Sequence, residues 1–393
     1  MNNVGQVNLA GRVHGFAESV IREMGRLAQE HQAINLAQGI PDAETPPALI
    51  EAAQQAVAGD FNQYPLTWGS PSLRAAISEK VASFNGLSAD PETQITVGCG
   101  STECMQAALL ALVDPGDEVI LFQPFYENYL AQCLIAGARP VLVALRPPHW
   151  QLDPDELRKA ISPKTKAIVL NTPGNPTGHV FSREELDSVA KLCQDFGLVA
   201  ITDEIYEHII YTDQPHVSLA TLPGMADRTV TISGLSKTFC VTGWRLGYCI
   251  ASPTITNGIR KVHDFLTIGA PHPLQIAGAA ALKLDASYYH SLRDRYRHRR
   301  DLLLGYLRSA GFEPHEPEGA YYILSDIRSF GDEDDVSFVR RLAREAGVTA
   351  VPSSCFHSPP EAGRHLIRFM FAKKDATIHA AGERLVKWRH GSA

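Results

Sequence analysis

Two residues that can do covalent or acid–base chemistry follow short apolar runs of the sequence, where buried β-strands would end. Asp203 comes directly after the run 199–202, and Lys237 comes five residues after the run 229–232. A carboxylate at the end of a buried strand is costly unless it has a partner or a function. A lysine among serines and glycines at such a strand end is a candidate for attack on a carbonyl carbon, with formation of a Schiff base.

Other strand ends carry residues that suit a flat ligand with a phosphate group. The segment 98–102 (GCGST) opens a helix, and free N–H groups at a helix start bind anions. Aromatic residues in 123–129 can stack on a ring, and the prolines and glycines of 171–178 form a rigid turn that fixes Asn175. Arg245 adds a second cation eight residues after Lys237. Each feature alone also has a structural explanation, namely a helix cap, rim packing or a turn.

Taken together, these residues match the chemical needs of pyridoxal 5′-phosphate. Its aldehyde needs a lysine, its ring nitrogen needs an acidic partner, and its phosphate needs N–H groups and an arginine. Its ring also needs a stacking face. The sequence supplies the whole set, one group after another, at the ends of predicted strands.

The elements that would position these residues alternate between strands and helices. This alternation predicts an α/β fold with a mostly parallel sheet that is covered by helices on both faces. In such sheets, ligands bind beyond the carboxyl ends of the strands. The predicted strands are 119–122, 141–145, 167–170, 199–202 and 229–232, and the helices between them are 103–112, 128–136, 155–160 and 183–194.

The end of the chain has a different pattern, which predicts a smaller α+β domain. A long charged helix at 286–310 is followed by strands at 321–325, 348–351 and 366–371 and by a helix at 335–346. We expect the arginines of the long helix (293, 295, 297, 299 and 300) to lie on a solvated face.

Three parts of the chain are therefore expected, with no flexible linker between them. Residues 1–45, with a helix at about 17–30 and an extended segment at 35–42, would form an N-terminal arm and part of the small domain. Residues 46–285 would form the large domain, and residues 286–393 the C-terminal small domain.

Composition excludes several classes of function. Of the 393 residues, 45% are hydrophobic and 20% are charged, which is typical of a globular protein. A net charge of −7 gives no basic surface for nucleic acid, and no apolar run approaches the about 18–20 residues of a membrane span. The first residues show no basic stretch followed by an apolar one, so we expect no secretory signal. The seven cysteines are scattered without a Cys-x-x-Cys pair. We expect reduced thiols, no metal site and a cytoplasmic protein.

At the level of motifs, the sequence resembles the class I and II aminotransferases, which have the aspartate-aminotransferase fold. The motifs NPTG (175–178), DEIY (203–206), SKTF (236–239) and GWRLG (243–247) carry this resemblance, and it covers nearly the whole chain. The segments EHQAINLAQGIPD (30–42) and LIRFMFAKK (366–374) are most similar to the kynurenine/glutamine transaminases and the bacterial methionine aminotransferases. The resemblance implies the fold of PLP-dependent transferases, a homodimer, and transfer of an α-amino group to a 2-oxo acid.

The resemblance also implies a role for each matching residue. Lys237 would form the Schiff base with pyridoxal 5′-phosphate, and Asp203 would pair with its ring nitrogen. Tyr206 and Asn175 would bond the ring hydroxyl oxygen, and Tyr126 would stack on the ring. The phosphate would be held by Gly100, Ser101, Thr102, Ser236 and Arg245, with Tyr64 reaching the phosphate of the neighbouring subunit.

The amino-acid substrate would meet a second set of residues. The resemblance implies that Arg368 binds the α-carboxylate, with Gly39, Asn175 and Ile21 as further contacts. One departure from the family pattern is Gly234, where several relatives have a phosphate-binding serine; Ser233 or Ser236 could replace it.

For the substrate side chain, the sequence favours a neutral group. Dicarboxylate-specific relatives present an arginine from the partner subunit, but residues 262–282 contain no arginine or lysine. Ile21, Ile40 and Ile268 would line the pocket by resemblance, so we expect an apolar, sulfur-containing, aromatic or amide amino acid. A cation could still come from elsewhere; the candidates are Arg12, Arg22, His263 and His272.

Three alternatives stay open to different degrees. One is an aspartate or broad-range aminotransferase, and another is a PLP-dependent β-lyase acting on cysteine S-conjugates, which uses the same cofactor chemistry. The third is the aminotransferase-like half of a transcription regulator. That architecture needs a fused DNA-binding domain, and only about 35 residues precede the NLAQGIPD segment.

Overall fold

A seven-stranded sheet forms the centre of the computed structural model, which describes residues 9–16, 18–42 and 44–391. The strand order is β2-β8-β7-β6-β5-β3-β4, and β3 to β7 pair in parallel. Only β8 runs antiparallel to its neighbours β7 and β2. This confirms the predicted mostly parallel α/β sheet. Its strands are β2 (Ile95–Cys99), β3 (Glu118–Gln123), β4 (Arg139–Ala144), β5 (Thr165–Asn171), β6 (Val199–Asp203), β7 (Thr229–Gly234) and β8 (Leu246–Ile250).

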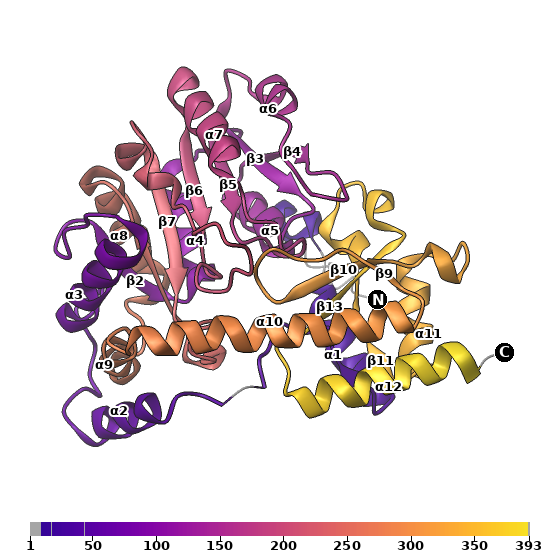
Figure 1. Ribbon diagram of the computed structural model, residues 1–393. Coiled ribbons are helices and arrows are strands. Elements are labelled where there is room, and N and C mark those ends of the chain that lie inside the picture. The colour runs from indigo at the N-terminus through magenta and orange to yellow at the C-terminus, as the bar shows by residue number, and fades with distance from the viewer. Residues whose placement is uncertain (1–8, 17, 43, 392–393) are drawn as a thin grey trace, which may run out of the picture.

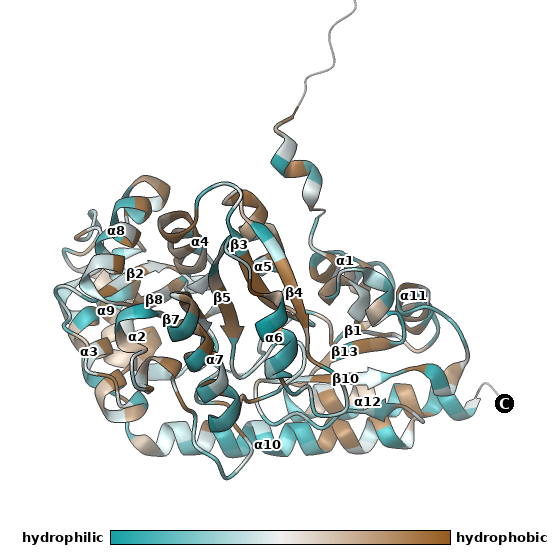
Figure 2. Ribbon diagram, turned by 90° about the horizontal axis from the view of Figure 1, so that it is seen from above, coloured by the Kyte–Doolittle hydropathy of each residue, from teal (hydrophilic) through white to brown (hydrophobic). Residues whose placement is uncertain are grey.

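The sheet is buried on both faces, and its strands carry apolar side chains on each of them. In β3, Ile120 belongs to one hydrophobic cluster and Leu121 to the cluster on the other face. Helices α4 (Ser101–Leu112), α5 (Glu127–Ile135) and α8 (Pro253–Thr267) cover one face. Helices α6 (Pro154–Ala160) and α7 (Arg183–Phe196) cover the other, and Figure 2 shows the apolar strands enclosed between these helices.

A third group of helices packs at the edge formed by β2 and β8. Their apolar side chains, among them Leu49, Leu73 and Ile77, share one buried cluster with Val97 and Leu246. The helices of this group are α2 (Pro47–Ala58), α3 (Pro71–Lys80) and α9 (His272–Ala281).

A second, smaller sheet follows in the C-terminal part, with the antiparallel order β12-β13-β10-β9. Helix α10 (Ala286–Ser309) runs beneath the large sheet and reaches the small one, as both views show (Figures 1 and 2). The other elements of this part are β9 (Glu313–Pro314), β10 (Tyr322–Asp326), α11 (Asp335–Glu345), β12 (Val351–Pro352), β13 (Leu366–Met370) and α12 (Asp375–Gly391).

The predicted strand 348–351 is wrong in one respect, because the chain forms two short strands there. Strand β11 (Val348–Thr349) pairs in parallel with β1 (Ile34–Asn35), whereas β12 pairs with β13. Helix α1 (Val20–Glu30) precedes β1; the residue at which we expected this helix to begin, Ala17, lies outside the described residues. The division into three parts stays a prediction, and the β1–β11 pairing supports grouping the N-terminal segment with the C-terminal part.

The solvated arginine face expected on α10 is wrong for two of its five arginines. The side chain of Arg299 is 8% exposed and bonds Asp375 of α12, at 3.1 Å. Arg300 is 13% exposed and lies over the ring of Tyr211, 4.8 Å from its centroid. With 3.6 residues per turn, arginines at five of eight successive positions cannot share one face.

The sequence predicts that no segment spans a membrane and that the cysteines are not paired in disulfides. Within the described ranges, no helix is long and apolar enough to cross a membrane. All seven cysteines are free thiols.

A protonated histidine ties the loop after β5 to the segment between β9 and β10. His179 lies between the carboxylates of Glu185 and Glu318, at 3.1 Å from each, and its side chain is 5% exposed. Burial opposes the charged form, but the two carboxylates outweigh it and raise the pKa of His179 to about 9.

This histidine predicts a pH dependence of stability. A raised folded-state pKa stabilises the protein below the unfolded pKa of about 6.5, and this contribution is lost as the pH rises through about 9. Relative to His179→Gln, the wild type should lose on the order of 3 kcal/mol between about pH 6 and pH 9.5. Thermal midpoints of both proteins at constant ionic strength measure this; a constant difference across the range would contradict it.

Candidate active site

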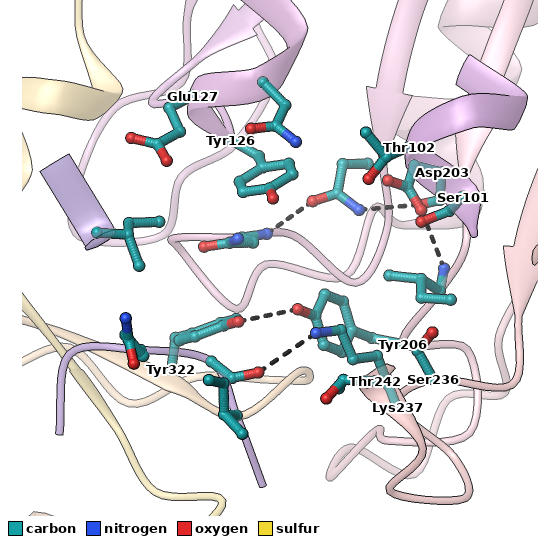
Figure 3. Close-up of a pocket in the computed structure, with 18 of the residues that line it drawn as sticks. Ser101, Thr102, Tyr126, Glu127, Asp203, Tyr206, Ser236, Lys237, Thr242 and Tyr322 are labelled. Carbon is teal, nitrogen blue, oxygen red and sulfur yellow. Dashed lines mark hydrogen bonds between the residues drawn. The ribbon is translucent and has the colours of Figure 1, made fainter. Parts of the chain in front are cut away.

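A hollow of about 460 Å³ lies beyond the carboxyl ends of β5, β6 and β7, against the small sheet. Figure 3 shows side chains from the start of α4, from these strand ends and from β10 converging on it. Parallel strands bring their ends to one edge, so the sequence motifs after each strand meet here. The predicted site residues that line the hollow are Ile21, Gly39, Ser101, Thr102, Tyr126, Asn175, Asp203, Tyr206, Ser236, Lys237, Arg245 and Arg368.

Lys237 is held at the hollow by a backbone carbonyl. Its Nζ donates a hydrogen bond to the oxygen of Gly39 at 3.3 Å and lies 5.8 Å from the ring centroid of Tyr321. Burial lowers its pKa, because a desolvated ammonium is unfavourable. The amine is thereby shifted toward its neutral form, which is both a nucleophile and a base.

Asp203 ends β6 as a buried carboxylate. The hydroxyl of Tyr129 donates to its Oδ2 at 2.7 Å, and the N–H of Ile205 donates to its Oδ1 at 3.3 Å. Burial dominates and raises the pKa of Asp203 to about 6. A donor that carries positive charge would therefore gain an unusually strong acceptor here.

Two neighbouring buried carboxylates each have a basic partner, which Asp203 does not have. Glu204 lies 2.7 Å from Nε2 of His216, and Glu207 lies 2.6 Å from Nζ of Lys80. Burial raises the pKa of Glu207, but the Lys80 ammonium, together with His208, His216 and the hydrogen bond from Asn85, outweighs burial and lowers this pKa to about 2. Among the ion pairs of the described residues, none involves Asp203. Its carboxylate faces the hollow, where a cationic N–H group of a ligand would form the missing ion pair.

A group of hydrogen-bond donors that would suit an anion lies where α4 begins. The first N–H groups of a helix have no acceptor within the helix, so those of Ser101 and Thr102 are available to a ligand. The guanidinium of Arg245 lies beside them: a Cβ at Gly100 would come 2.5 Å from its Nη2. Gly100 therefore caps the helix with φ +82° and leaves room for the arginine, although it does not itself line the hollow.

The glycine that departs from the family pattern, Gly234, has a packing reason. A Cβ at this position would lie 2.8 Å from the carbonyl oxygen of Leu246 on the neighbouring strand. Of the two serines expected to replace its hydroxyl, Ser236 lines the hollow. The hydroxyl of Ser233 instead donates to Glu207 at 2.6 Å.

Arg368 on β13 is completely buried without a carboxylate partner. Its Nη1 donates to Oδ1 of Asn175 at 2.6 Å, and its Nη2 donates to the carbonyl of Ala37 at 2.9 Å. Its Nε is buried with no hydrogen-bond partner, and its plane lies 4.2 Å from the ring centroid of Tyr322. Since the oxygen of Asn175 is taken by Arg368, the NH₂ group of this amide is the part left for a ligand oxygen.

The prediction from sequence missed two tyrosines of the site. Tyr129 lies one helical turn after Tyr126 and bonds Asp203, so its spacing could have revealed it. The hydroxyl of Tyr322 lies 3.0 Å from that of Tyr206. Because Leu324 of β10 is paired with Arg368, Tyr322 shares the sheet face of the arginine; only the strand register shows this.

Besides Gly100, two residues expected at the site lie outside the hollow of a single chain. Tyr64 is 79% exposed and Ile268 is 49% exposed, and neither lines it, whereas Ile40 does. Phe265, 92% exposed, extends the apolar surface beside Ile268. The proposed contact of Tyr64 with a neighbouring subunit stays a prediction.

Of the four cations considered for a distal carboxylate, Arg22 alone lines the hollow, and the other three lie elsewhere in the described chain. His263 lies 2.8 Å from Glu103, and Nδ1 of His272 lies 3.1 Å from the carbonyl of Gln63. Arg12 belongs to a short 3₁₀ helix before α1.

The chain is similar over nearly its whole length to several known aminotransferases. The structure of N-succinyldiaminopimelate aminotransferase from Mycobacterium tuberculosis superposes with a TM-score of 0.94 at 40% identity, over 97% of this chain and all of that one. Methionine aminotransferase of Escherichia coli is 39% identical, over 93% of this chain and 95% of the relative. Human kynurenine–oxoglutarate transaminase 1 is 38% identical over 97% and 98%. Residues 31–385 match the family described as aminotransferase class I and II. The chain therefore belongs to the class I and II aminotransferases.

Proposed function

We propose that this aminotransferase uses pyridoxal 5′-phosphate and moves the α-amino group of an amino acid with a neutral side chain to a 2-oxo acid. The observation that carries the proposal is a pair of uncompensated buried charges in one hollow with Lys237. Among the described residues, the Asp203 carboxylate forms no ion pair with a cation, and the buried Arg368 guanidinium forms none with an anion. The cofactor ring nitrogen and the substrate carboxylate are the groups that would complete them.

The residues around the hollow suit the cofactor group by group. Asp203 would accept a hydrogen bond from the ring nitrogen and keep it protonated, and Tyr126 would pack against the ring. Tyr206 and Asn175 would bond the ring hydroxyl oxygen. The phosphate would lie at the start of α4, held by Ser101, Thr102, Ser236 and Arg245. When bound, pyridoxal phosphate supplies an electron sink for the charge that the substrate develops at Cα.

The chain itself would supply orientation and proton transfer. The planar fork of Arg368 would bind both oxygens of the α-carboxylate and so fix which bond at Cα faces the cofactor. Lys237, with its lowered pKa, would take the Cα proton of the substrate as a neutral amine. It would then give this proton to the former aldehyde carbon of the cofactor. The carbonyl of Gly39 would hold that amine in reach between the two steps.

A neutral side chain is favoured by what lines the hollow near the substrate. Ile21 and Ile40 contribute apolar surface, and residues 262–282 bring no lysine or arginine. The relatives named for methionine and kynurenine support this class. Candidate substrates are apolar, sulfur-containing, aromatic or amide amino acids.

We further propose a cytoplasmic homodimer. Exposed apolar side chains of Tyr64, Leu66, Phe265 and Ile268 would be covered by a second copy. In that arrangement, Tyr64 would reach the phosphate site of the partner. Measurement of the mass in solution by light scattering tests this, and a monomer would contradict it.

A half-reaction screen tests the proposed function directly. Each amino acid is mixed with the purified protein loaded with pyridoxal phosphate, and the visible absorbance of the cofactor is followed without any oxo acid. Amino donors should convert the cofactor once and then stop. Continuous release of pyruvate and ammonia from a cysteine S-conjugate, with no oxo acid present, would instead identify a β-lyase.

The two arginines of the site predict different binding defects. Arg245→Ala should weaken cofactor affinity by about tenfold or more, because it removes a charge-assisted contact to the phosphate. Arg368→Ala should leave cofactor affinity within about threefold and raise the KM for the amino acid instead. Cofactor titration and steady-state kinetics of both variants measure this; equal cofactor dissociation constants would remove the distinction.

A further inference from the structure

Arg22 lines both the active-site hollow and a second hollow beside α1. It lies in the first turn of α1, whose N-cap Ser19 accepts a hydrogen bond from its N–H. Its side chain is exposed, whereas Arg368 in the same hollow is fully buried. Arg22 and Gln38 also line an open groove of about 690 Å³ along α1. The active-site hollow and this groove therefore share these two residues.

The groove is polar and carries no acidic side chain among its lining residues. It presents the amides of Gln29, Gln32, Asn35 and Gln38 together with Arg22 and Arg26. Arg26 is neutralised by Glu18 at 2.7 Å, but none of the ion pairs of the described chain involves Arg22. Such a surface suits a carbonyl or carboxylate group.

Gln38 is held at the junction between the two hollows. The amide oxygen of Asn35 accepts the N–H of Gln38 at 3.1 Å, and Nδ2 of Asn35 donates to Oε1 of Gln38 at 3.4 Å. With its oxygen engaged, the NH₂ group of Gln38 is the part available to a ligand carbonyl. A ligand carbonyl at the junction would accept from this donor, and Arg22 lines the same two hollows.

We propose that Arg22, with Gln38, determines specificity by binding a carboxylate or carbonyl at the far end of a long substrate side chain. The inference rests on the proposed function and adds one case to its neutral side chains, namely a side chain that is neutral where it passes Ile21 and Ile40 and carries its charge only at its far end. With its α-carboxylate on the buried Arg368, a substrate would need a long side chain to reach the exposed Arg22 at the mouth. Four methylenes and an amide place the distal group several bonds farther from Cα than the single methylene of aspartate does, so we expect only the longer side chain to reach Arg22.

Two ligands that cannot react separate this inference from catalysis. 6-(Succinylamino)hexanoate and 6-acetamidohexanoate both carry a carboxylate and an amide but no α-amino group, and only the first has a distal carboxylate. By calorimetry with the loaded protein, the succinyl compound should bind at least about fivefold more tightly. Arg22→Gln should abolish this preference.

A matched control and a kinetic comparison complete the test. Arg340 of α11 pairs with Glu23 of the same helix α1, at 3.2 Å, but lies outside both hollows, so Arg340→Gln should keep the preference. Arg22→Gln should also lower kcat/KM for Nε-succinyl-lysine about fivefold or more while that for methionine stays within about twofold. A calorimetric preference that is absent in the wild type, or unchanged in Arg22→Gln, would overturn the inference. If no amino acid is converted at all, the proposed function fails, and calorimetry still decides the role of Arg22.

Discussion

Lys237→Ala is expected to remain folded and to bind pyridoxal phosphate, but to lose turnover by at least about 10³-fold. The reason is that one amine is proposed both to attach the cofactor and to carry the substrate proton. Phosphate and ring contacts, including those of Arg245 and Asp203, do not depend on this amine, so binding should persist. Absorbance spectra, cofactor titration and steady-state rates measure the three quantities separately.

A neighbouring lysine provides the matched control. Nζ of Lys373 donates to the carbonyl of Ile40 at 3.1 Å, next along the chain to the carbonyl of Gly39 that holds Lys237. Burial lowers the pKa of Lys373 as well, but this residue does not line the hollow. Lys373→Ala should therefore keep turnover within about threefold of the wild type. If Lys237→Ala instead transaminates at a rate near that of the wild type, the proposed role of Lys237 is wrong.

The site residues that sequence predicted best are those that follow parallel strands. Asp203 and Asn175 follow neighbouring strands β6 and β5, and Lys237 follows β7, so their meeting depends only on a fold that local patterns indicate. The motif order then makes the family recognisable. For these residues the structure adds distances and partners, such as the bond from Arg368 to Asn175.

Residues whose place depends on the packing of distant segments could not be predicted in the same way. Tyr322 reaches the site because β10 pairs with β13 in one register, which no short pattern encodes. Arg300 packs against the ring of Tyr211, although the many charged residues of its helix predicted a solvent-exposed face. Arg22 was one of four candidate cations, and only the position of α1 beside the hollow distinguishes it.

Aspartate is expected to be a poor substrate, with kcat/KM at least about 10²-fold below that of methionine or phenylalanine. A distal carboxylate buried without a partner costs several kcal/mol, whereas an apolar side chain gains about 1.5–3 kcal/mol on burial. Ile21 and Ile40 line the hollow with apolar surface, and Arg368 is engaged by the α-carboxylate. Measurements with aspartate, glutamate, glutamine, methionine and phenylalanine and one common oxo acid test this.

Glutamate and glutamine form the sharpest pair in that series, because they differ in charge but hardly in shape. A hollow in which Arg22 lies beyond the reach of so short a side chain should favour glutamine, since an amide loses less on desolvation than a carboxylate does. If aspartate instead exceeds methionine and phenylalanine, the neutral pocket is wrong and a cation must reach the side chain. Arg22 lines the hollow, so Arg22→Gln would then abolish the use of aspartate; use that survives this change would require a cation from a second subunit.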